Sequence, residues 1–127
     1  MEWHFDDNMP IYTQLVYQIK FAIVSGELSP GEKMAGVRDL AADAGVNPNT
    51  MQRAPQQLER EGLVFTQRSS GRFITEDTAV IGEAKRTLAR QHIEQFMASM
   101  KKLGYTREEI IALLESGEEE DKNGSML

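Results

Sequence analysis

The chain has 127 residues, of which 40% are hydrophobic, and it contains no cysteine. This length suits one small domain with an appendage, and the absence of thiols excludes disulfides, thiolate metal sites and a cysteine nucleophile. The net charge of −6 argues against a nucleic-acid partner, because nucleic-acid-binding domains are usually basic. Residues 1–76 carry seven basic and ten acidic side chains, and residues 77–127 carry the same numbers, so the local placement of charge matters more than its sum.

The first third of the chain predicts an arm and two helices. Residues 2–5 alternate between apolar and polar side chains, which indicates a short edge strand or an extended arm. A helix is predicted from Pro10 to about Ser25, where Gly26 is placed to end it. A second helix is predicted over residues 37–44, followed by a tight link at residues 44–47.

A third helix is predicted from Pro48, with Asn47 as its N-cap. Its apolar residues fall on one face, and the opposite face is rich in amides and arginine: Asn49, Gln52, Arg53, Gln56 and Arg60. Amide and guanidinium groups can form paired hydrogen bonds with adenine and guanine edges in the DNA major groove. We therefore interpret this face as a DNA-reading surface, against the simpler interpretation of an ordinary solvated helix face.

A hairpin follows the third helix, with strands at residues 63–66 and 72–75 and a tip at residues 68–71. Two helices joined by a tight turn and followed by a hairpin are typical of a winged helix-turn-helix. The predicted fold class is therefore mainly α with a small β-wing, in which residues 1–76 form a DNA-binding domain.

The remaining residues predict a helical appendage. A long helix is expected over residues 80–103, ended by Gly104, and a capping box at residues 106–109 opens a last helix. Their apolar stripe cannot form a core alone, so it must pack on the winged domain or on a second copy. We predict a dimerisation segment over residues 77–117 and a disordered acidic tail over residues 118–127, with contacts made by Ile81, Leu88, Phe96, Met100, Leu103, Ile110 and Leu114.

Residues 34–75, MAGVRDLAADAGVNPNTMQRAPQQLEREGLVFTQRSSGRFIT, resemble the winged helix-turn-helix of the GntR family of bacterial transcription regulators. Residues 10–33 are similar to that family's first helix and its Gly-x-Leu-x-Pro-Gly turn. The opening MEWHFDDNMPIY and the short segment after the wing resemble its YtrA-like subfamily. The resemblance implies a bacterial, nucleoid-associated regulator, most often a repressor, that binds a palindromic double-stranded DNA operator as a homodimer.

The resemblance also implies roles for individual residues. Arg38, in the motif Val-Arg-Asp-Leu, matches an arginine that holds a DNA phosphate, whereas from sequence alone it is an ordinary solvated charge. The reading helix would contribute Asn47, Asn49, Thr50, Gln52 and Arg53, and the hairpin tip would reach the minor groove with Arg68, Ser69, Ser70 and Gly71. Arg72 also lies on a segment expected to meet DNA. Gly36 replaces the family's usual serine cap, at a cost of about a few tenths of a kcal/mol.

Pro55 departs from the family pattern, because it stands inside the reading helix where a bulky apolar residue is usual. A proline there removes the hydrogen bond to the Met51 carbonyl and collides with it, at a cost of about 3 kcal/mol. We therefore expect the helix to be kinked or broken near Ala54, with Gln56 and Arg60 displaced from the line of the preceding turns.

Other functions have weaker support. His4 and His92 do not stand at the spacing of a metal site or a catalytic triad, so we expect no enzymatic activity, metal or cofactor. No apolar run reaches the roughly 20 residues of a membrane helix, and no signal peptide is evident, so a soluble cytoplasmic protein without a membrane partner is expected. The rival interpretation is a protein-interaction module whose winged domain has lost DNA binding. The tail is too small to enclose an effector, so any inducer should bind at the dimer interface or between tail and winged domain.

Overall fold

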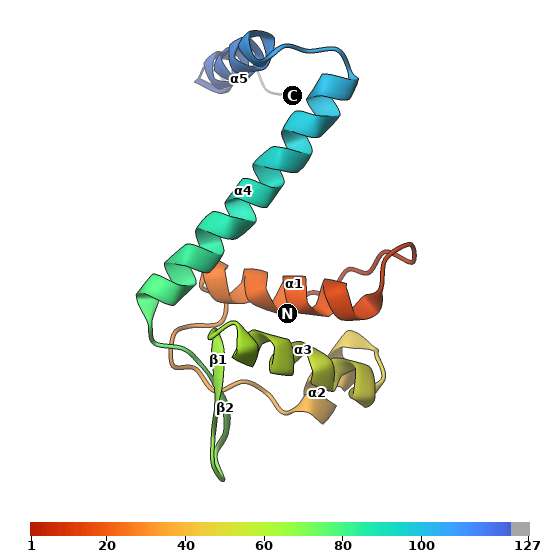
Figure 1. The fold of residues 1–127 in the computed structure, drawn as a ribbon, viewed down its shortest axis with the longest axis vertical. Coiled ribbons are helices and arrows are strands. Elements are labelled where there is room, and N and C mark those ends of the chain that lie inside the picture. Colours follow the sequence, from red (N-terminus) through yellow and green to blue (C-terminus); the bar gives the residue numbers. More distant parts are fainter. Residues whose placement is uncertain (123–127) are drawn as a thin grey trace. The chain divides into compact units, whose positions relative to one another are not determined.

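A computed structural model of the protein describes residues 1–122, with side chains to residue 117. Its elements are α1 (Ile11–Ser25), α2 (Val37–Ala44), α3 (Pro48–Arg60), β1 (Val64–Gln67), β2 (Gly71–Ile74), α4 (Thr78–Lys102) and α5 (Arg107–Lys122) (Figure 1). This order confirms the predicted mainly helical fold with a small wing. The chain forms two compact units, residues 1–88 and the residues from Ala89 onward. No helix within the described residues is both long and apolar enough to cross a membrane.

The core of the first unit lies between α1, α3 and the wing. Leu15 and Ile19 of α1 are fully buried beside Met51 and Leu58 of α3, and Ile74 of β2 closes the same cluster. Each side chain of this size stabilises the fold by about 1.5–3 kcal/mol relative to an exposed position. The core therefore fixes α3 by one face and leaves its opposite face outside.

The N-terminal residues form an arm rather than a strand. The backbone N–H of His4 donates to Gln18 Oε1 at 3.1 Å, and Gln18 Nε2 donates back to the His4 carbonyl at 2.7 Å. Trp3 Nε1 donates to Asp43 Oδ2 at 2.8 Å. The Gln18 side chain thus bonds the backbone of the arm in the way that a neighbouring strand would, and Trp3 joins the arm to α2.

The wing is an antiparallel pair in which Val64 lies opposite Ile74. The segment before α2 adds a further rung, because the Met34 N–H donates to the Arg72 carbonyl at 2.9 Å and the Ile74 N–H donates to the Glu32 carbonyl at 2.8 Å. These bonds extend the sheet on the side of β2. Sequence reasoning missed this pairing because the segment is too short to show a strand pattern.

Of the two outcomes expected at Pro55, a kink or a break, the break does not occur. The structure has α3 running without interruption from Pro48 to Arg60, with Pro55 inside it and fully buried. The helix loses one backbone donor at this position, but the proline ring adds apolar surface to the same core that holds Met51 and Leu58. Burial and the remaining hydrogen bonds offset the missing one, so the helix continues.

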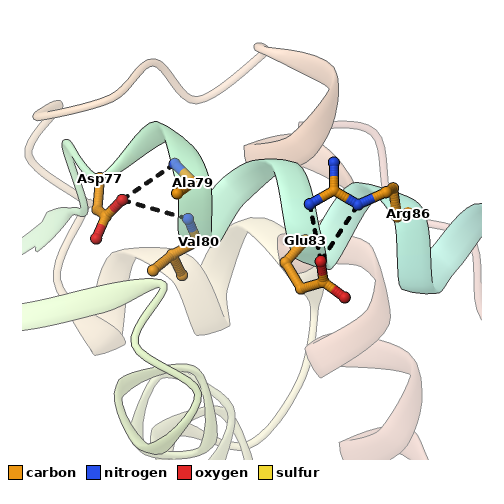
Figure 2. A network of polar contacts seen from close by, with 5 residues as sticks. All are labelled: Asp77, Ala79, Val80, Glu83 and Arg86. Atoms are coloured by element: carbon orange, nitrogen blue, oxygen red, sulfur yellow. Dashed lines mark hydrogen bonds and ion pairs between the residues drawn. The ribbon is translucent and has the colours of Figure 1, made fainter.

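The first turn of α4 is capped by a carboxylate, as Figure 2 shows. Asp77 Oδ1 accepts hydrogen bonds from the backbone N–H of Ala79 at 3.0 Å and of Val80 at 3.4 Å. An acid at this place satisfies N–H groups that have no intrahelical acceptor. One turn later Glu83 and Arg86 form an exposed ion pair at 2.8 Å. The cap explains why α4 begins at Thr78, two residues before the predicted start.

The apolar residues of α4 form two faces rather than the single stripe expected. Val80, Ile81 and Ala84 pack against the core of the first unit, and Leu88 is buried. At 3.6 residues per turn, the later apolar residues lie about a third of a turn around the helix from these. These later residues include exposed Ile93. One helix therefore both completes the winged core and carries a second apolar surface.

The capping box of the last helix is confirmed. The Thr106 N–H donates to Glu109 Oε1 at 2.9 Å, and the Glu109 N–H donates to Thr106 Oγ1 at 3.2 Å. Because α5 extends to Lys122, the first five residues of the predicted disordered tail, 118–122, are helical instead. Residues 123–127 of that tail lie outside the described residues.

We expect Pro55→Leu to raise the melting temperature by several degrees. The substitution restores the backbone donor and removes the ring clash of a proline, which together cost about 3 kcal/mol in a helix interior, and it keeps the position apolar. Pro55→Ala restores the same donor without filling the site, so its gain should be smaller. Circular dichroism melts measure both. Because α3 is already continuous, DNA affinity should stay the same, and an unchanged melting temperature would show that the helix carries no strain here.

Candidate nucleic-acid interface

A tight turn joins α2 to α3 and places the start of α3. Gly45 ends α2 in the left-handed conformation, with φ at 72°, and the Val46 N–H donates back to the Ala41 carbonyl at 3.0 Å. Asn47 then caps α3 by accepting a hydrogen bond from the Asn49 N–H at 2.8 Å. The side chain of Asn47 is therefore occupied in starting the helix.

The polar face of α3 points away from the core over its whole length. Five of its amide and arginine side chains are exposed, and Thr50 is half-buried: the exposed set is Asn49, Gln52, Arg53, Gln56 and Arg60. Met51, Ala54 and Leu58 are buried on the opposite face. The predicted division of α3 into a core face and an open face is present, with Gln56 and Arg60 on the same unbroken helix as Gln52.

The other predicted site residues lie on α2 and on the wing. Arg38 is exposed on α2, in the turn after the Gly36 cap. The hairpin tip is exposed throughout, from Arg68 to Gly71. Ser69 has a φ of 64°, a left-handed conformation that costs a non-glycine residue about 1–2 kcal/mol. The tip is thus a tight turn whose serine side chains and backbone are open to solvent.

Glu59 joins the end of α3 to the wing. Its Oε1 accepts a hydrogen bond from Thr66 Oγ1 at 2.6 Å and another from Arg72 Nε. The hydrogen bonds from Thr66 and Arg72, followed by the positive charge of Arg72, hold the pKa of Glu59 below its usual value despite some burial. Arg72, which the sequence placed among residues meeting DNA, therefore serves to hold the wing against α3.

A second paired acid lies at the C-terminal end of α3. Burial raises the pKa of Glu61, but hydrogen bonds from Lys20 and Gln57 and the charge of Lys20 outweigh this effect and leave the pKa lowered. Lys20 Nζ lies 2.6 Å from Glu61 Oε1. Both acids at this end of the reading helix are thus paired with cations from other elements.

The remaining arginines of the site carry the local positive charge. Arg38, Arg53 and Arg68 form no ion pair with any carboxylate of the described part of the chain. They lie on α2, on α3 and at the wing tip, all within the first unit. Within the described residues, Arg38, Arg53 and Arg68 are thus unpaired cations in an acidic protein, while Glu59 and Glu61 at the end of α3 are paired with Arg72 and Lys20.

Sequence reasoning missed two members of this site, Tyr12 and Glu59. The guanidinium carbon of Arg53 lies 4.2 Å from the centroid of the Tyr12 ring. Tyr12 is 41 positions away in the chain, and Glu59 reads as one acid among several at the end of α3. Neither contact has a periodic or spacing signal in the sequence, because both depend on how separate elements pack.

The seven residues predicted for dimerisation fall into two groups. Those already covered within one chain are Ile81, which packs on the winged core, and the buried residues Leu88 and Ile110. The others are half-buried Met100 and exposed Phe96, Leu103 and Leu114. Further exposed apolar side chains of α4 and α5 are Ile93, Ile111 and Leu113.

These features define the class of protein. A continuous helix with an open amide and arginine face follows a tight turn, and a two-stranded wing is tied to its end. This is the winged helix-turn-helix architecture of DNA-binding regulators. The sequence profile of the bacterial regulatory proteins of the gntR family matches residues 11–74. The chain belongs to the GntR family.

Two curated relatives and one solved structure resemble nearly the whole chain. The uncharacterized transcriptional regulator YhcF of Bacillus subtilis is 42% identical over 111 residues, covering 87% of this chain and 92% of YhcF. The transcriptional repressor YtrA of Bacillus subtilis is 33% identical, covering 90% and 94%. A GntR family regulator from Listeria monocytogenes is 41% identical with a TM-score of 0.81, covering 88% and 98%. The similarity therefore extends beyond the DNA-binding domain into the C-terminal helices.

We expect Glu59→Gln to lower the free energy of unfolding at neutral pH, because it removes the charged acceptor that joins α3 to the wing. The pKa of Glu59 is lowered in the folded state. Its contribution is therefore complete above the unfolded carboxyl pKa, near ~4.3, and is lost as the pH falls through the folded pKa.

Denaturant unfolding at a series of pH values from neutral to acid tests this expectation. The difference in stability between wild type and Glu59→Gln should narrow as the pH falls. Glu94→Gln, which changes an exposed acid on α4, serves as the control and should show little difference at any pH. If the difference in unfolding free energy between wild type and Glu59→Gln stays constant down to acid pH, the charge of Glu59 contributes nothing to stability.

Proposed function

We propose that this GntR-family regulator is a repressor that binds a palindromic operator as a homodimer and reads it with the open face of α3. Regulators of this family bind DNA operators. The observation that carries the proposal is the exposure of Gln52 and Arg53 on a continuous helix whose opposite face is fully buried. A helix held in this way can enter a major groove without disturbing the core.

The contacts are proposed to divide by chemistry. Arg38 neutralises a phosphate beside the helix-turn-helix, which adds affinity without sequence preference. Asn49, Gln52 and Arg53 bond to base edges, because amide and guanidinium groups match adenine and guanine. At the wing tip, Arg68 suits the negative potential of a minor groove, and Gly71 permits close backbone contact.

The two features that favour the rival function, a protein-interaction module without DNA binding, carry less weight in the structure. One support was a disrupted reading helix, but α3 runs unbroken through Pro55. The other was the acidic net charge, but Glu59 and Glu61 are paired with Arg72 and Lys20. Two relatives that this chain matches over more than nine tenths of their length are named as transcription regulators, which also favours the DNA-binding function.

The second apolar face of α4 supports the homodimer. Ile93 and Phe96 lie on this face, and Leu103 directly follows the helix. The exposed fraction of these three side chains ranges from 42% to 71%. An exposed apolar patch of this kind marks an interaction surface. A second copy is the proposed occupant, because a two-fold contact uses the same patch on both chains. Such a two-fold axis would place the two half-sites of the operator a multiple of one helical turn apart.

Repression is proposed because occupancy of an operator needs no further activity of the chain, and because the similar protein YtrA is named a repressor. The proposed location is the bacterial nucleoid, where the operator lies. A small-molecule effector is compatible with this function, and its chemistry is open.

The two kinds of contact predict different losses of affinity. Arg38→Ala should weaken binding to all duplexes alike and reduce the slope of log affinity against log salt by about one. Gln52→Ala should lower the binding free energy by about 1–3 kcal/mol, and only for duplexes that carry particular base pairs. Fluorescence anisotropy against DNA from the protein's own promoter region, and against single-base-pair variants of it, measures both.

Lys102→Ala is the matched control for charge, because Lys102 is exposed at the end of α4 and outside the proposed interface. It should leave both affinity and salt slope close to wild type. Unchanged affinity for both Arg38→Ala and Gln52→Ala would show that α3 is not the reading helix. Failure of the wild-type chain to bind any promoter fragment would favour the interaction-module function.

The proposed dimer predicts that Phe96→Glu yields a monomer. A buried, unpaired carboxylate at a two-fold contact is costly, and the symmetry introduces it twice. Ala98→Glu places the same charge on the opposite side of α4, at an exposed position, and should remain dimeric. Light scattering after size-exclusion chromatography gives the mass. A dimer that survives both Phe96→Glu and Leu103→Glu would place the contact on another surface.

A further inference from the structure

The second residue of α1 lies under the reading helix. The Arg53 guanidinium carbon is 4.2 Å from the centroid of the Tyr12 ring, a distance at which the ring face attracts a cation. Tyr12 is half-buried and Arg53 is exposed. The ring therefore supports an arginine that would otherwise extend freely into solvent.

The Tyr12 ring is itself held in place by α3. Its hydroxyl lies 3.5 Å from Gln57 Oε1, at the long limit of a hydrogen bond. Gln57 Oε1 also accepts a hydrogen bond from Arg60 Nε at 3.1 Å, and Gln57 Nε2 donates to Glu61 Oε2 at 2.9 Å. Arg53 and Gln57 are one helical turn apart, so Tyr12 contacts the same edge of α3 at two successive turns.

The contact with the Tyr12 ring leaves the N–H groups of Arg53 available, because none of them donates a hydrogen bond within the described part of the chain. These groups point outward in the guanidinium plane, which is how arginine forms two parallel bonds to guanine. None of the described carboxylates pairs with Arg53. The Tyr12 ring thus restrains the rotamers of Arg53 without occupying its donors, and restraint of a long side chain before binding reduces the entropy lost on binding.

We propose that Tyr12 is a positioning residue that determines base-pair specificity through Arg53. This inference rests on the proposed function of α3 as the reading helix, and it adds a residue from outside the helix-turn-helix. Tyr12 orients the Arg53 guanidinium for a guanine edge. Its loss should reduce discrimination at the base pair that Arg53 reads and leave the phosphate contacts unchanged.

The experiment uses the full chain and the duplex that the wild type selects most strongly from a random library. Affinities are measured for this duplex and for its single-base-pair variants, with wild type, Tyr12→Leu, Tyr12→Phe, Arg53→Ala and the double variant Tyr12→Leu/Arg53→Ala. Tyr12→Leu should lose about two- to fivefold in discrimination, the range expected of an exposed cation–π contact, and only at base pairs where Arg53→Ala also loses it.

Two controls separate positioning from folding. Tyr12→Phe keeps the ring and should retain the wild-type base-pair profile, because only the long hydroxyl contact is removed. In the Arg53→Ala background, Tyr12→Leu should change discrimination no further. The inference would be overturned if Tyr12→Leu lowered the affinity for all duplexes equally, or if it still changed base-pair discrimination in the Arg53→Ala background. Tyr12 would then be a packing residue.

Nuclear magnetic resonance of the wild-type chain provides a test that needs no variant to fold. The Cδ protons of Arg53 should be shifted upfield by the Tyr12 ring current, and unshifted protons would overturn the inference. The two failures are distinguishable. If the wild type prefers no duplex, the proposed function is wrong, and the inference falls with it. If the wild type discriminates and Tyr12→Leu discriminates equally well, only the inference is wrong.

Discussion

The burial of one face of α3 is the constraint on which the rest of the structure depends. Met51, Ala54 and Leu58 are completely covered by the core, and α1 provides the surface against which they pack. Because successive residues of a helix are about 100° apart, burial of these positions places Gln52 and Arg53 on the exposed side of α3. The same packing holds Pro55, whose ring contributes to the core at a point where the backbone has lost a hydrogen bond. The stability of the fold and the exposure of the amide and arginine face of α3 therefore have one cause.

Charge at the site follows from pairing rather than from composition. The two acids at the end of α3 are paired with cations from the wing and from α1, so they contribute little field at the open face. These pairs also join α3 to its neighbours. Glu59 is paired with Arg72 of the wing, and Glu61 is paired with Lys20 of α1. A protein with a formal charge of −6 can thus present arginines that are unpaired among the described residues, near a helix whose two C-terminal acids are paired with cations.

The long helix α4 serves two purposes because its apolar residues change face along its length. Ile81 packs on the winged core and Leu88 is buried. Phe96, and Leu103 just after the end of the helix, are exposed. The change of face explains why a helix that belongs to the winged core can also carry a second, exposed apolar surface. The capping carboxylate of Asp77 fixes where the helix begins, and so fixes the register of both faces.

Local patterns in the sequence by themselves determined the elements and their order. The N-cap of α3, the glycine after α2 and the capping box at Thr106 and Glu109 act over a few residues, so they are legible without a structure. The division of α3 into two faces follows from the same short-range periodicity. Only the tertiary structure decided what depends on contacts between distant residues. The sequence could not show that Pro55 is tolerated, because the burial of its ring depends on how the elements pack. It could not place Tyr12 beside Arg53 or pair Arg72 with Glu59. It also could not separate the buried apolar residues of α4 from the exposed ones. Each of these depends on packing between elements far apart in the chain.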